Sequence, residues 1–336
     1  MKLLTVLVPC YNSESLMRKA LDSVMIDDER LDVLIVDDGS KDGTPLIADE
    51  YQEKYPSIVR VIHQENGGHG EGLNQGIKNG LGKYFKALDS DDYFSKDLKL
   101  FLDTLERIDS EGGVDLLITD YRYIVNGKEG KVISYKRQIP KDRIIGWDEV
   151  KKFEPKQLIT IHSATFRMEI LRESGIVLPK HISYEDNYYI HGNLQNVKKL
   201  YYMNIDLYQY TIGRAEQSTS KENIVKHYDQ QVLVTTLMFK SYHLDDPRFT
   251  KGQVRYMYHS LYMFLAITCV LAHTYKGGGA ADELKKMWDE VIAYDEKMGK
   301  KFRYKTFIRT LNMPGKLGHI FGTFLYKLSH IFVRFN

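Results

Sequence analysis

The sequence predicts an α/β fold in which a Rossmann-like, mostly parallel sheet carries helices on both faces and is followed by a helical C-terminal region. Short apolar runs rich in β-branched residues alternate with amphipathic segments in the N-terminal part, as in parallel sheets whose strands are joined by helices. A hairpin pattern then interrupts the alternation, so we expect a mixed second half of the sheet. From about residue 224 onward only helical patterns remain.

The expected elements follow one another in short segments. The first strand covers residues 3–8 and ends at Pro9, and Asn12 or Ser13 is expected to cap the next helix. An Asn-Gly turn at Asn126 predicts a hairpin between residues 121–125 and 131–135. The other expected strands are 33–36, 58–62, 84–88, 114–119, 159–166 and 207–210, and the expected helices are 16–24, 44–55, 70–79 and 95–108.

The length of 336 residues fits one large or two smaller domains, with 43% hydrophobic and 27% charged residues, as in ordinary globular proteins. We expect a domain over residues 1–220 and a helical region over 221–336. Cys10 and Cys269 offer no disulfide framework, which fits a reducing cytosol. The longest apolar run, 257–272, is short for a membrane span, so a buried helix is expected there.

Charge is segregated along the chain. Residues 297–336 hold nine Lys and Arg and no acidic residue, so this tail carries +9 and the rest −7 of the net +2. Aromatic residues interleave with these cations, which favours an interfacial helix that contacts anionic lipid and a location at the inner face of the cell membrane. Packing of the tail against the body is the alternative. No nucleic-acid-binding motif accompanies the tail.

An apolar run with strand character, residues 84–88, ends abruptly at three carboxylates. Asp89, Asp91 and Asp92 fall within four positions, with Ser90 among them. Carboxylates packed this closely repel one another unless a cation or water screens them, and hard divalent ions prefer oxygen ligands. The alternative interpretation is a solvated acidic turn that caps the next helix.

Three further loops are expected at the same carboxyl edge of the sheet, where open α/β sheets bind ligands. They are 9–12, 37–40 and 66–72. Tyr11 offers a ring face for a nucleobase, and a carboxylate at Asp38 can accept the imide N–H of a uracil. Each loop alone is an ordinary turn, but their joint occurrence at successive strand ends predicts one ligand crevice.

As an ordered set, these motifs resemble those of the family 2 glycosyltransferases. The motifs are Val8-Pro9-Cys10-Tyr11-Asn12, Val36-Asp37-Asp38-Gly39-Ser40, Asn66-Gly67-Gly68-His69-Gly70 with Asn74 and Gly76, and Leu88-Asp89-Ser90-Asp91-Asp92. The resemblance covers about the first two thirds of the chain. It implies a GT-A fold, a nucleotide-sugar donor that is most often UDP-linked, a divalent metal (Mg²⁺ or Mn²⁺), and inversion at the anomeric carbon.

The resemblance also implies roles for single residues on the donor side. Tyr11 and Asp38 would hold the uracil and Asp89 the ribose. Asp91, the second carboxylate of the Asp-x-Asp motif, would bind the metal, with Asp89 beside it. Pro9, Ser90 and Asn74 belong to the same donor motifs. Many members have an Arg-Asn pair where this chain has Leu73-Asn74, so His69 or Arg214 is the candidate for the missing positive charge.

The second half carries the candidate base and acceptor residues. In the family, an acidic pair placed like Glu185-Asp186 supplies the catalytic base, usually through its second member, which is Asp186 here; a helix start with acids that complement the dipole is the alternative. Arg214 follows the last strand pattern, where the family closes over the donor. His162, on a strand pattern, and Tyr184 are candidates for the acceptor pocket.

The expected function is therefore metal-dependent, inverting transfer of a sugar to a hydroxyl of a glycan or lipid-linked acceptor, in cell-surface polysaccharide synthesis. A nucleotidyltransferase that makes nucleotide sugars is an alternative, but its glycine-rich basic loop is missing after the first strand. A dinucleotide-dependent dehydrogenase would have its glycine motif there too. A non-catalytic binding module would bind UDP without turnover.

Overall fold

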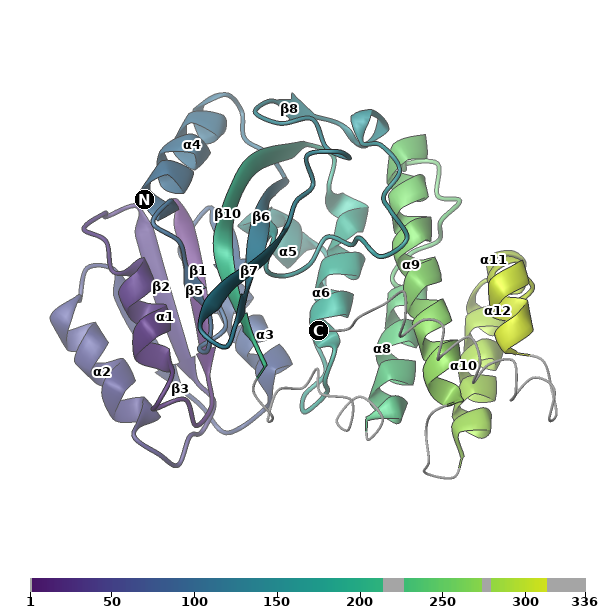
Figure 1. Ribbon diagram of the computed structural model, residues 1–336, viewed down its shortest axis with the longest axis horizontal. Helices are drawn as coiled ribbons and strands as arrows, with labels where there is room; N and C mark the ends of the chain where they lie inside the picture. Colours follow the sequence, from purple (N-terminus) through teal and green to yellow (C-terminus); the bar gives the residue numbers. More distant parts are fainter. Residues whose placement is uncertain (1, 214–226, 274–278, 313–336) are drawn as a thin grey trace. The chain divides into compact units, whose positions relative to one another are not determined.

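The computed structural model describes residues 2–213, 227–273 and 279–312 (Figure 1). The chain divides into two compact units. Unit 1 comprises residues 1–151 and 159–212, and unit 2 comprises residues 152–158 and 213–336. Arg214 and the greater part of the basic tail, residues 313–336, lie outside the described residues.

Unit 1 is built on one mixed sheet with the strand order β3-β2-β1-β4-β9-β6-β10-β5, while β7 pairs with β6 and β8 with β10. The neighbours β3, β2, β1 and β4 are all parallel, and β10 is parallel to β6. Strand β9 is antiparallel to both β4 and β6. The strands are β1 Leu4–Cys10, β2 Leu31–Asp37, β3 Val59–His63, β4 Tyr84–Ala87, β5 Tyr93–Phe94, β6 Leu116–Val125, β7 Lys128–Ile133, β8 Ile144–Ile145, β9 Ala164–Arg167 and β10 Leu200–Ile212.

Helices lie on both faces of this sheet, because its central strands are apolar on both sides. All seven residues of β1 are buried. Helices α1, α2 and α4 share one hydrophobic core with alternate residues of β1 and β2. The glycine at Gly76 lets α3 approach Leu7 and Phe85 on the other face, where Phe85 also meets Tyr189 of α6. The helices are α1 Met17–Val24, α2 Thr44–Lys54, α3 His69–Asn79, α4 Leu98–Ser110, α5 Met168–Glu173 and α6 Glu185–Asn193, with short 3₁₀ turns at Trp147–Glu149 and Leu194–Asn196.

This architecture confirms the expected α/β class and most of the predicted elements, with three local corrections. The expected separate strands 114–119 and 121–125 form one strand, β6, because both pair with β10, whose register shifts between the two segments. Residues 159–163 precede β9, and 161–163 form a turn, so His162 does not lie on a strand. Neither Asn12 nor Ser13 caps α1; Leu16 occupies that position and makes no side-chain cap.

The backbone at Gly82 lies so close to the backbone of β1 that a side chain there would disturb the packing of the sheet. A Cβ there would meet the backbone nitrogen of Thr5 and, at 2.5 Å, the carbonyl carbon of Leu4. Backbone cannot move aside as a side chain can, so we expect Gly82→Ala to lower the free energy of unfolding by about 3 kcal/mol, the upper end for overpacking. Gly146→Ala is the matched control, because its Cβ would meet nothing within 4 Å. Urea unfolding curves that coincide for the two variants would contradict this packing.

Unit 2 is helical over its described residues after 226, with α8 Tyr228–Lys240, α9 Lys251–Ala272, α10 Ala280–Tyr294, α11 Glu296–Arg303 and α12 Thr306–Leu311. The expected apolar helix over 257–272 is confirmed as part of α9. Within the described ranges, α9 alone is long and apolar enough to cross a membrane, yet half of its apolar window is buried, as in core helices.

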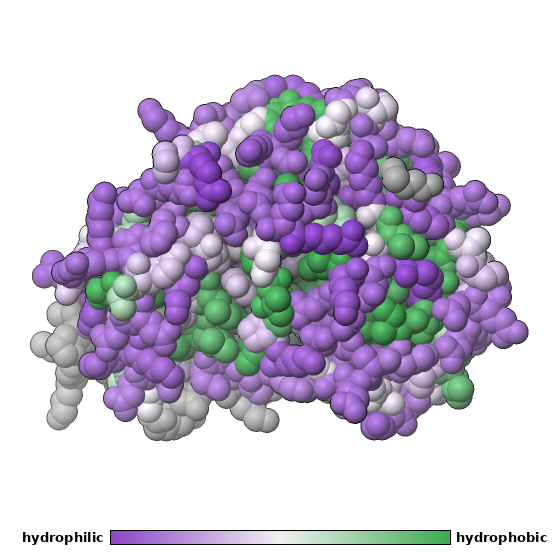
Figure 2. Space-filling view, turned by 180° about the vertical axis from the view of Figure 1, so that it is seen from behind, coloured by the Kyte–Doolittle hydropathy of each residue, from purple (hydrophilic) through white to green (hydrophobic). Residues whose placement is uncertain are grey.

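The first part of the basic tail packs within unit 2. The Phe302 ring stacks on Tyr258 with centroids 4.5 Å apart, and Ile308 and Leu311 are buried. Trp288 donates its indole N–H to Asn312 over 3.0 Å. Over residues 297–312 the structure therefore buries Phe302, Ile308 and Leu311, while Tyr304 and Phe307 are exposed beside the cations. On the face shown in Figure 2, hydrophilic residues predominate and hydrophobic residues form small, separate groups.

Candidate active site

The loops after β1, β2 and β4 converge at the carboxyl edge of the sheet, as expected. Asp38 N–H donates to Cys10 O over 2.8 Å, which joins the first two loops. The hydroxyls of Ser13 and Ser90 lie 2.8 Å apart, which joins the first loop to the acidic one. Three segments that are far apart in the sequence thus form one edge because parallel strands end on the same side.

A pocket of about 540 Å³ opens beside the loops after β1 and β2. Tyr11 lines it with a side chain that is 52% exposed. Its other lining residues come from the loops after β2 and β3, and they are Gly39, Lys41, His63, Gln64, Glu65 and Asn66. An exposed aromatic ring at the wall of a polar pocket is suited to stacking on a flat heterocycle.

Asp38 is buried and organises the neighbouring glycine-rich loop. One carboxylate oxygen accepts from Gln64 Nε2 at 2.6 Å and Gly67 N at 2.8 Å, and the other accepts from Gly68 N at 2.8 Å. Each carboxylate oxygen has two acceptor positions, so the second oxygen retains one for a ligand. The structure thus places Asp38 at the loop that was expected to bind a base and gives it a supporting role there.

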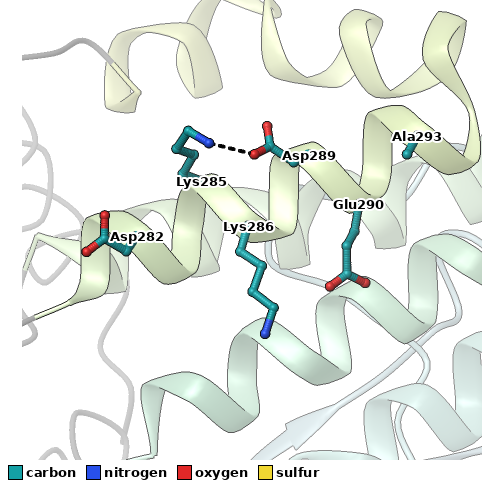
Figure 3. Close-up of a pocket in the computed structure, with 6 residues that line it drawn as sticks. All are labelled: Asp282, Lys285, Lys286, Asp289, Glu290 and Ala293. Carbon is teal, nitrogen blue, oxygen red and sulfur yellow. Dashed lines mark hydrogen bonds and ion pairs between the residues drawn. The ribbon is translucent and has the colours of Figure 1, made fainter.

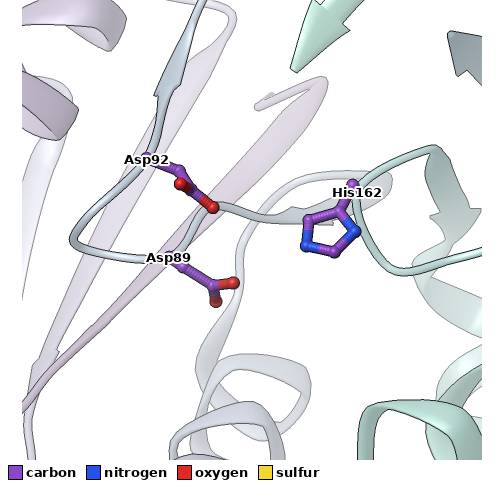
Figure 4. Close-up of side chains that lie close together, drawn as sticks. All are labelled: Asp89, Asp92 and His162. Carbon is purple, nitrogen blue, oxygen red and sulfur yellow. The ribbon is translucent and has the colours of Figure 1, made fainter. Parts of the chain in front are cut away.

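The acidic loop after β4 is a compact cluster with His162. Single ligand atoms of Asp89, Asp92 and His162 lie within 4.8 Å of one another, and their side chains point into a common space (Figure 4). Burial and the nearby Asp89 charge raise the pKa of Asp92 well above its usual value. Asp92 accepts hydrogen bonds from Tyr208 Oη at 2.8 Å and Thr211 N at 2.7 Å. Asp92 therefore fastens the loop to β10.

The other two members of the acidic loop, Ser90 and Asp91, are partly buried. With Asp89 they form a run of oxygen ligands on one short loop, next to a buried acid and an imidazole. This donor set suits a hard divalent cation such as Mg²⁺ or Mn²⁺. The residues present therefore fit the metal that the sequence predicted.

His69, at the first turn of α3, bridges the acidic loop and α6. Its Nε2 lies 3.1 Å from Asp89 Oδ1, and its Nδ1 lies 2.6 Å from Glu185 Oε1. Burial opposes a charge on the ring, but the hydrogen bonds and charges of Asp89 and Glu185 outweigh it and raise the pKa of His69 well above its usual value. The ring is thus held by hydrogen bonds between two acidic side chains, one on the acidic loop and one on α6.

Asp186 follows Glu185 in the first turn of α6 and is partly buried. Burial, and then the charge of Glu185, raise the pKa of Asp186 to about 7. A carboxylate with a pKa near neutrality accepts a proton far more readily than an ordinary aspartate.

Tyr184, which precedes Glu185 and Asp186, has a φ of 70°. Such left-handed backbone is strained for a tyrosine and is characteristic of functional sites.

Three further residues that the sequence predicted for the site, Pro9, Asn74 and His162, are buried or hydrogen-bonded within unit 1. Pro9 is buried at the end of β1. The side chain of Asn74 is paired with the backbone of Leu178, accepting at 3.0 Å and donating at 2.9 Å. The His162 ring stacks on Tyr210 with centroids 4.1 Å apart, and burial lowers the pKa of His162 to about 4. The buried Nδ1 of His162 has no hydrogen-bond partner among the described residues.

Sequence reasoning missed Lys86, which is fully buried in β4. Its Nζ donates to His162 O at 2.9 Å and Ala164 O at 3.3 Å, so it holds the turn that carries His162. Burial lowers the pKa of Lys86 to about 7. A lysine inside an apolar strand pattern was the signal that could have identified it.

A second hollow, of about 390 Å³, lies on unit 2 (Figure 3). All of its lining residues belong to the one helix α10, and Lys285 and Asp289 pair across 2.8 Å. A charged helix surface of this kind is a solvated face and gives no chemistry.

Comparison with known proteins agrees with this geometry. The chain resembles, with a TM-score of 0.65 and 18% identity, a crystal structure of Staphylococcus aureus TarS in complex with UDP, and the match covers 98% of this chain and 91% of the other. It also resembles the mannosyltransferase PcManGT from Pyrobaculum calidifontis in complex with GDP-Man and Mn²⁺, with a TM-score of 0.53, 14% identity, and 98% and 86% coverage. At these identities the likeness establishes the fold, which is the GT-A type of glycosyltransferases.

The chain belongs to glycosyl transferase family 2, because the sequence model of that family matches residues 5–173, half of the chain. It is 30% identical over 226 residues to an uncharacterized glycosyltransferase of Mycoplasma genitalium, covering 65% of this chain and 70% of the relative. It is 35% identical over 128 residues to the glycosyltransferase GlyA of Streptococcus pneumoniae, covering 38% and 18%. The chain spans a fifth to a third of the Rickettsia glycosyltransferases it matches. Membership confirms the predicted family and favours transfer over the nucleotidyltransferase alternative.

Proposed function

We propose that the chain transfers a sugar from a nucleotide sugar, with UDP as the nucleotide, to an acceptor hydroxyl in a single, inverting displacement. The observation that carries this proposal is Asp186, a carboxylate with a pKa of about 7 whose neighbour Glu185 is hydrogen-bonded to the same imidazole as Asp89. A base and a donor-side carboxylate are thereby joined within one site. The TarS complexes with UDP and UDP-GlcNAc support a uridine nucleotide.

On the donor side, the ring of Tyr11 would stack on the uracil, and the remaining acceptor position of Asp38 would receive its imide N–H. Asp91, with Asp89, would hold Mg²⁺ or Mn²⁺, which when bound supplies positive charge to the diphosphate. The Mn²⁺ in the PcManGT complex supports this choice. Ser90 lies beside these carboxylates in the sequence, and Asn74 supports the donor side through its hydrogen bonds to the backbone of Leu178. Arg214 remains a prediction for the missing cation.

On the acceptor side, Asp186 would take the proton of the acceptor hydroxyl as that oxygen attacks the anomeric carbon from the face opposite the nucleotide. The bond between the anomeric carbon and the diphosphate oxygen would break as the new glycosidic bond forms. The electrons of the broken bond would leave with the UDP. No covalent sugar–enzyme intermediate is required. His162 and Tyr184 would hydrogen-bond acceptor hydroxyls, and support comes from the buried Nδ1 of His162 and Oη of Tyr184, which have no hydrogen-bond partner among the described residues.

Calorimetric titration tests the donor part of the proposal. The purified protein is titrated with UDP-, GDP- and dTDP-sugars, first with Mn²⁺ and then with EDTA. We expect one UDP-sugar to bind in the presence of Mn²⁺ and to lose most of its affinity in EDTA. Binding of UDP-sugars without turnover on any hydroxyl would instead support the binding-module alternative, and binding of no nucleotide sugar would refute the donor site.

The pKa of Asp186 predicts the pH dependence of the reaction. A general base acts only when deprotonated, and a pKa raised to about 7 leaves much of Asp186 protonated below neutrality. We therefore expect kcat to rise with pH through about 7 and to reach a plateau above it. Initial rates at saturating donor and acceptor, measured from about pH 5.5 to 9, check this. A profile that is flat between pH 6 and 8 would show that the base titrates elsewhere.

We further propose that the acceptor is a glycan or lipid-linked saccharide of the cell surface and that the enzyme works at the inner face of the membrane. Support comes from cations that lie outward on the described part of the tail, such as Lys301 and Arg309, which are exposed. A chain that ends after Asn312 lacks the last three cations of the tail but keeps all residues of helices α8 to α12. We expect the shortened chain to bind anionic phosphatidylglycerol vesicles more weakly than the full chain, with phosphatidylcholine vesicles as control; equal binding would contradict the tail's role.

A further inference from the structure

The N-terminal half of α3 is fastened to the segment that leads into α6. His181 N donates to Gly67 O at 2.8 Å, and Asn74 makes its two hydrogen bonds to the backbone of Leu178. Gly68 has a φ of 83°, and a Cβ there would lie 3.0 Å from the backbone nitrogen of His181. The glycine-rich loop and residues 178–185 thus pack backbone against backbone, a contact that larger side chains would prevent.

His69 is the side chain that completes this contact at the reacting end. Its two ring nitrogens face different elements, Nδ1 toward Glu185 of α6 and Nε2 toward Asp89 of the acidic loop. Glu185 is 4% exposed, and His69 is its one hydrogen-bonding side-chain partner among the described residues. The hydrogen bond to His69 fixes this buried side chain in place, because breaking it would leave a buried polar group without a side-chain partner.

We propose that His69 is a positioning residue that sets the base-bearing turn of α6 against the donor loop, through Glu185 on one side and Asp89 on the other. The inference rests on the proposed function, in which Asp186 is the base and Asp89 lies on the donor side. Asp186 adjoins Glu185 in the first helical turn, so a shift of Glu185 moves Asp186 with it. A misplacement of about 1 Å can cost about 10²-fold in rate.

Two amide substitutions separate the two sides of the bridge. The amide nitrogen of Asn falls near the position of Nδ1 in histidine, and that of Gln near the position of Nε2, so each variant keeps one donor and loses the other. His69→Gln therefore removes the bond to Glu185, and His69→Asn removes the bond to Asp89. Both variants are neutral and of similar size.

We expect His69→Gln to lower kcat by about 10- to 100-fold with a nearly unchanged dissociation constant for UDP with Mn²⁺. His69→Asn should bind UDP with Mn²⁺ more weakly than His69→Gln does, and its loss of kcat should be smaller. Glu185→Gln should lower kcat, and the double variant His69→Gln/Glu185→Gln should be no slower than the slower single one, because residues that act as a unit are not additive. Glu173→Gln, on the exposed end of α5, is the control.

Hydrogen exchange gives a readout that does not depend on activity. Amides of α6 should exchange faster in His69→Gln than in the wild type and in His69→Asn. Equal kcat losses in the two amide variants, multiplicative effects in the double variant, or unchanged exchange of α6 would overturn the positioning role. If the wild type bound no nucleotide sugar, but α6 still exchanged faster in His69→Gln than in the wild type and His69→Asn, only the proposed function would be contradicted.

Discussion

Replacing Asp186 with Asn is expected to lower kcat by about 10²- to 10⁴-fold, the usual contribution of a general base. The amide keeps the size of the side chain but has no basic oxygen at neutral pH. Donor binding should remain nearly intact, because Tyr11, Asp38 and Asp91 are unchanged. Single-turnover rates and the dissociation constant of UDP with Mn²⁺, measured on the same preparation, separate the two effects.

The control for this variant is Glu173→Gln, which makes the same chemical change on an exposed helix end. It should retain wild-type kcat. A second check uses pH, since the rise of kcat through about 7 should disappear in Asp186→Asn if that carboxyl is the titrating base. Wild-type turnover by Asp186→Asn would show that another group takes the proton.

The donor edge could be predicted from the sequence because its parts follow strand ends directly. Parallel strands bring Tyr11, Asp38 and Asp89 to one edge wherever the helices between them lie. The apolar runs and the residues after them are local signals, so both the strands and the loops could be read in order. The fold class and the family follow from the same signals, and both predictions are confirmed.

The contacts inside the site could not be predicted in this way, because they join residues that no local pattern relates. His69 and Glu185 are 116 positions apart, and so are Tyr208 and Asp92. The sequence indicated His69 as a candidate for the donor cation, and the structure adds that it lies between the side chains of Asp89 and Glu185. The pairing depends on how α3 packs on residues 178–185, and that packing is a property of the tertiary structure.

The predicted extent of the strand at β9 was wrong for the same reason. The apolar pattern over 159–166 predicted one strand, yet only Ala164–Arg167 pairs with β4 and β6. The preceding residues form a turn that is held by the buried Lys86. A hydrophobic run specifies burial, but hydrogen bonds to its neighbours decide whether it becomes a strand.

Replacing Asp91 with Ala is expected to remove most of the metal-dependent rate. A bound divalent ion contributes several kcal/mol of charge stabilisation to a leaving diphosphate, and each 1.36 kcal/mol is a factor of ten, so we expect a loss of about 10²- to 10³-fold in kcat/KM. The difference between Mn²⁺ and EDTA in UDP binding should shrink in parallel, which separates a metal ligand from a residue that only shapes the loop.

Glu53→Ala, which removes an exposed carboxylate on α2, is the control for the charge change itself. The comparison with Asp92→Asn is more informative. Asp92 is buried and bonded to Tyr208 and Thr211, whereas Asp91 is only partly buried, so we expect Asp92→Asn to lower the free energy of unfolding by more than Asp91→Ala does. If Asp92→Asn abolished the Mn²⁺ dependence and Asp91→Ala did not, the metal would sit deeper in the cluster, against Asp89, Asp92 and His162, and the assignment to Asp91 would be wrong.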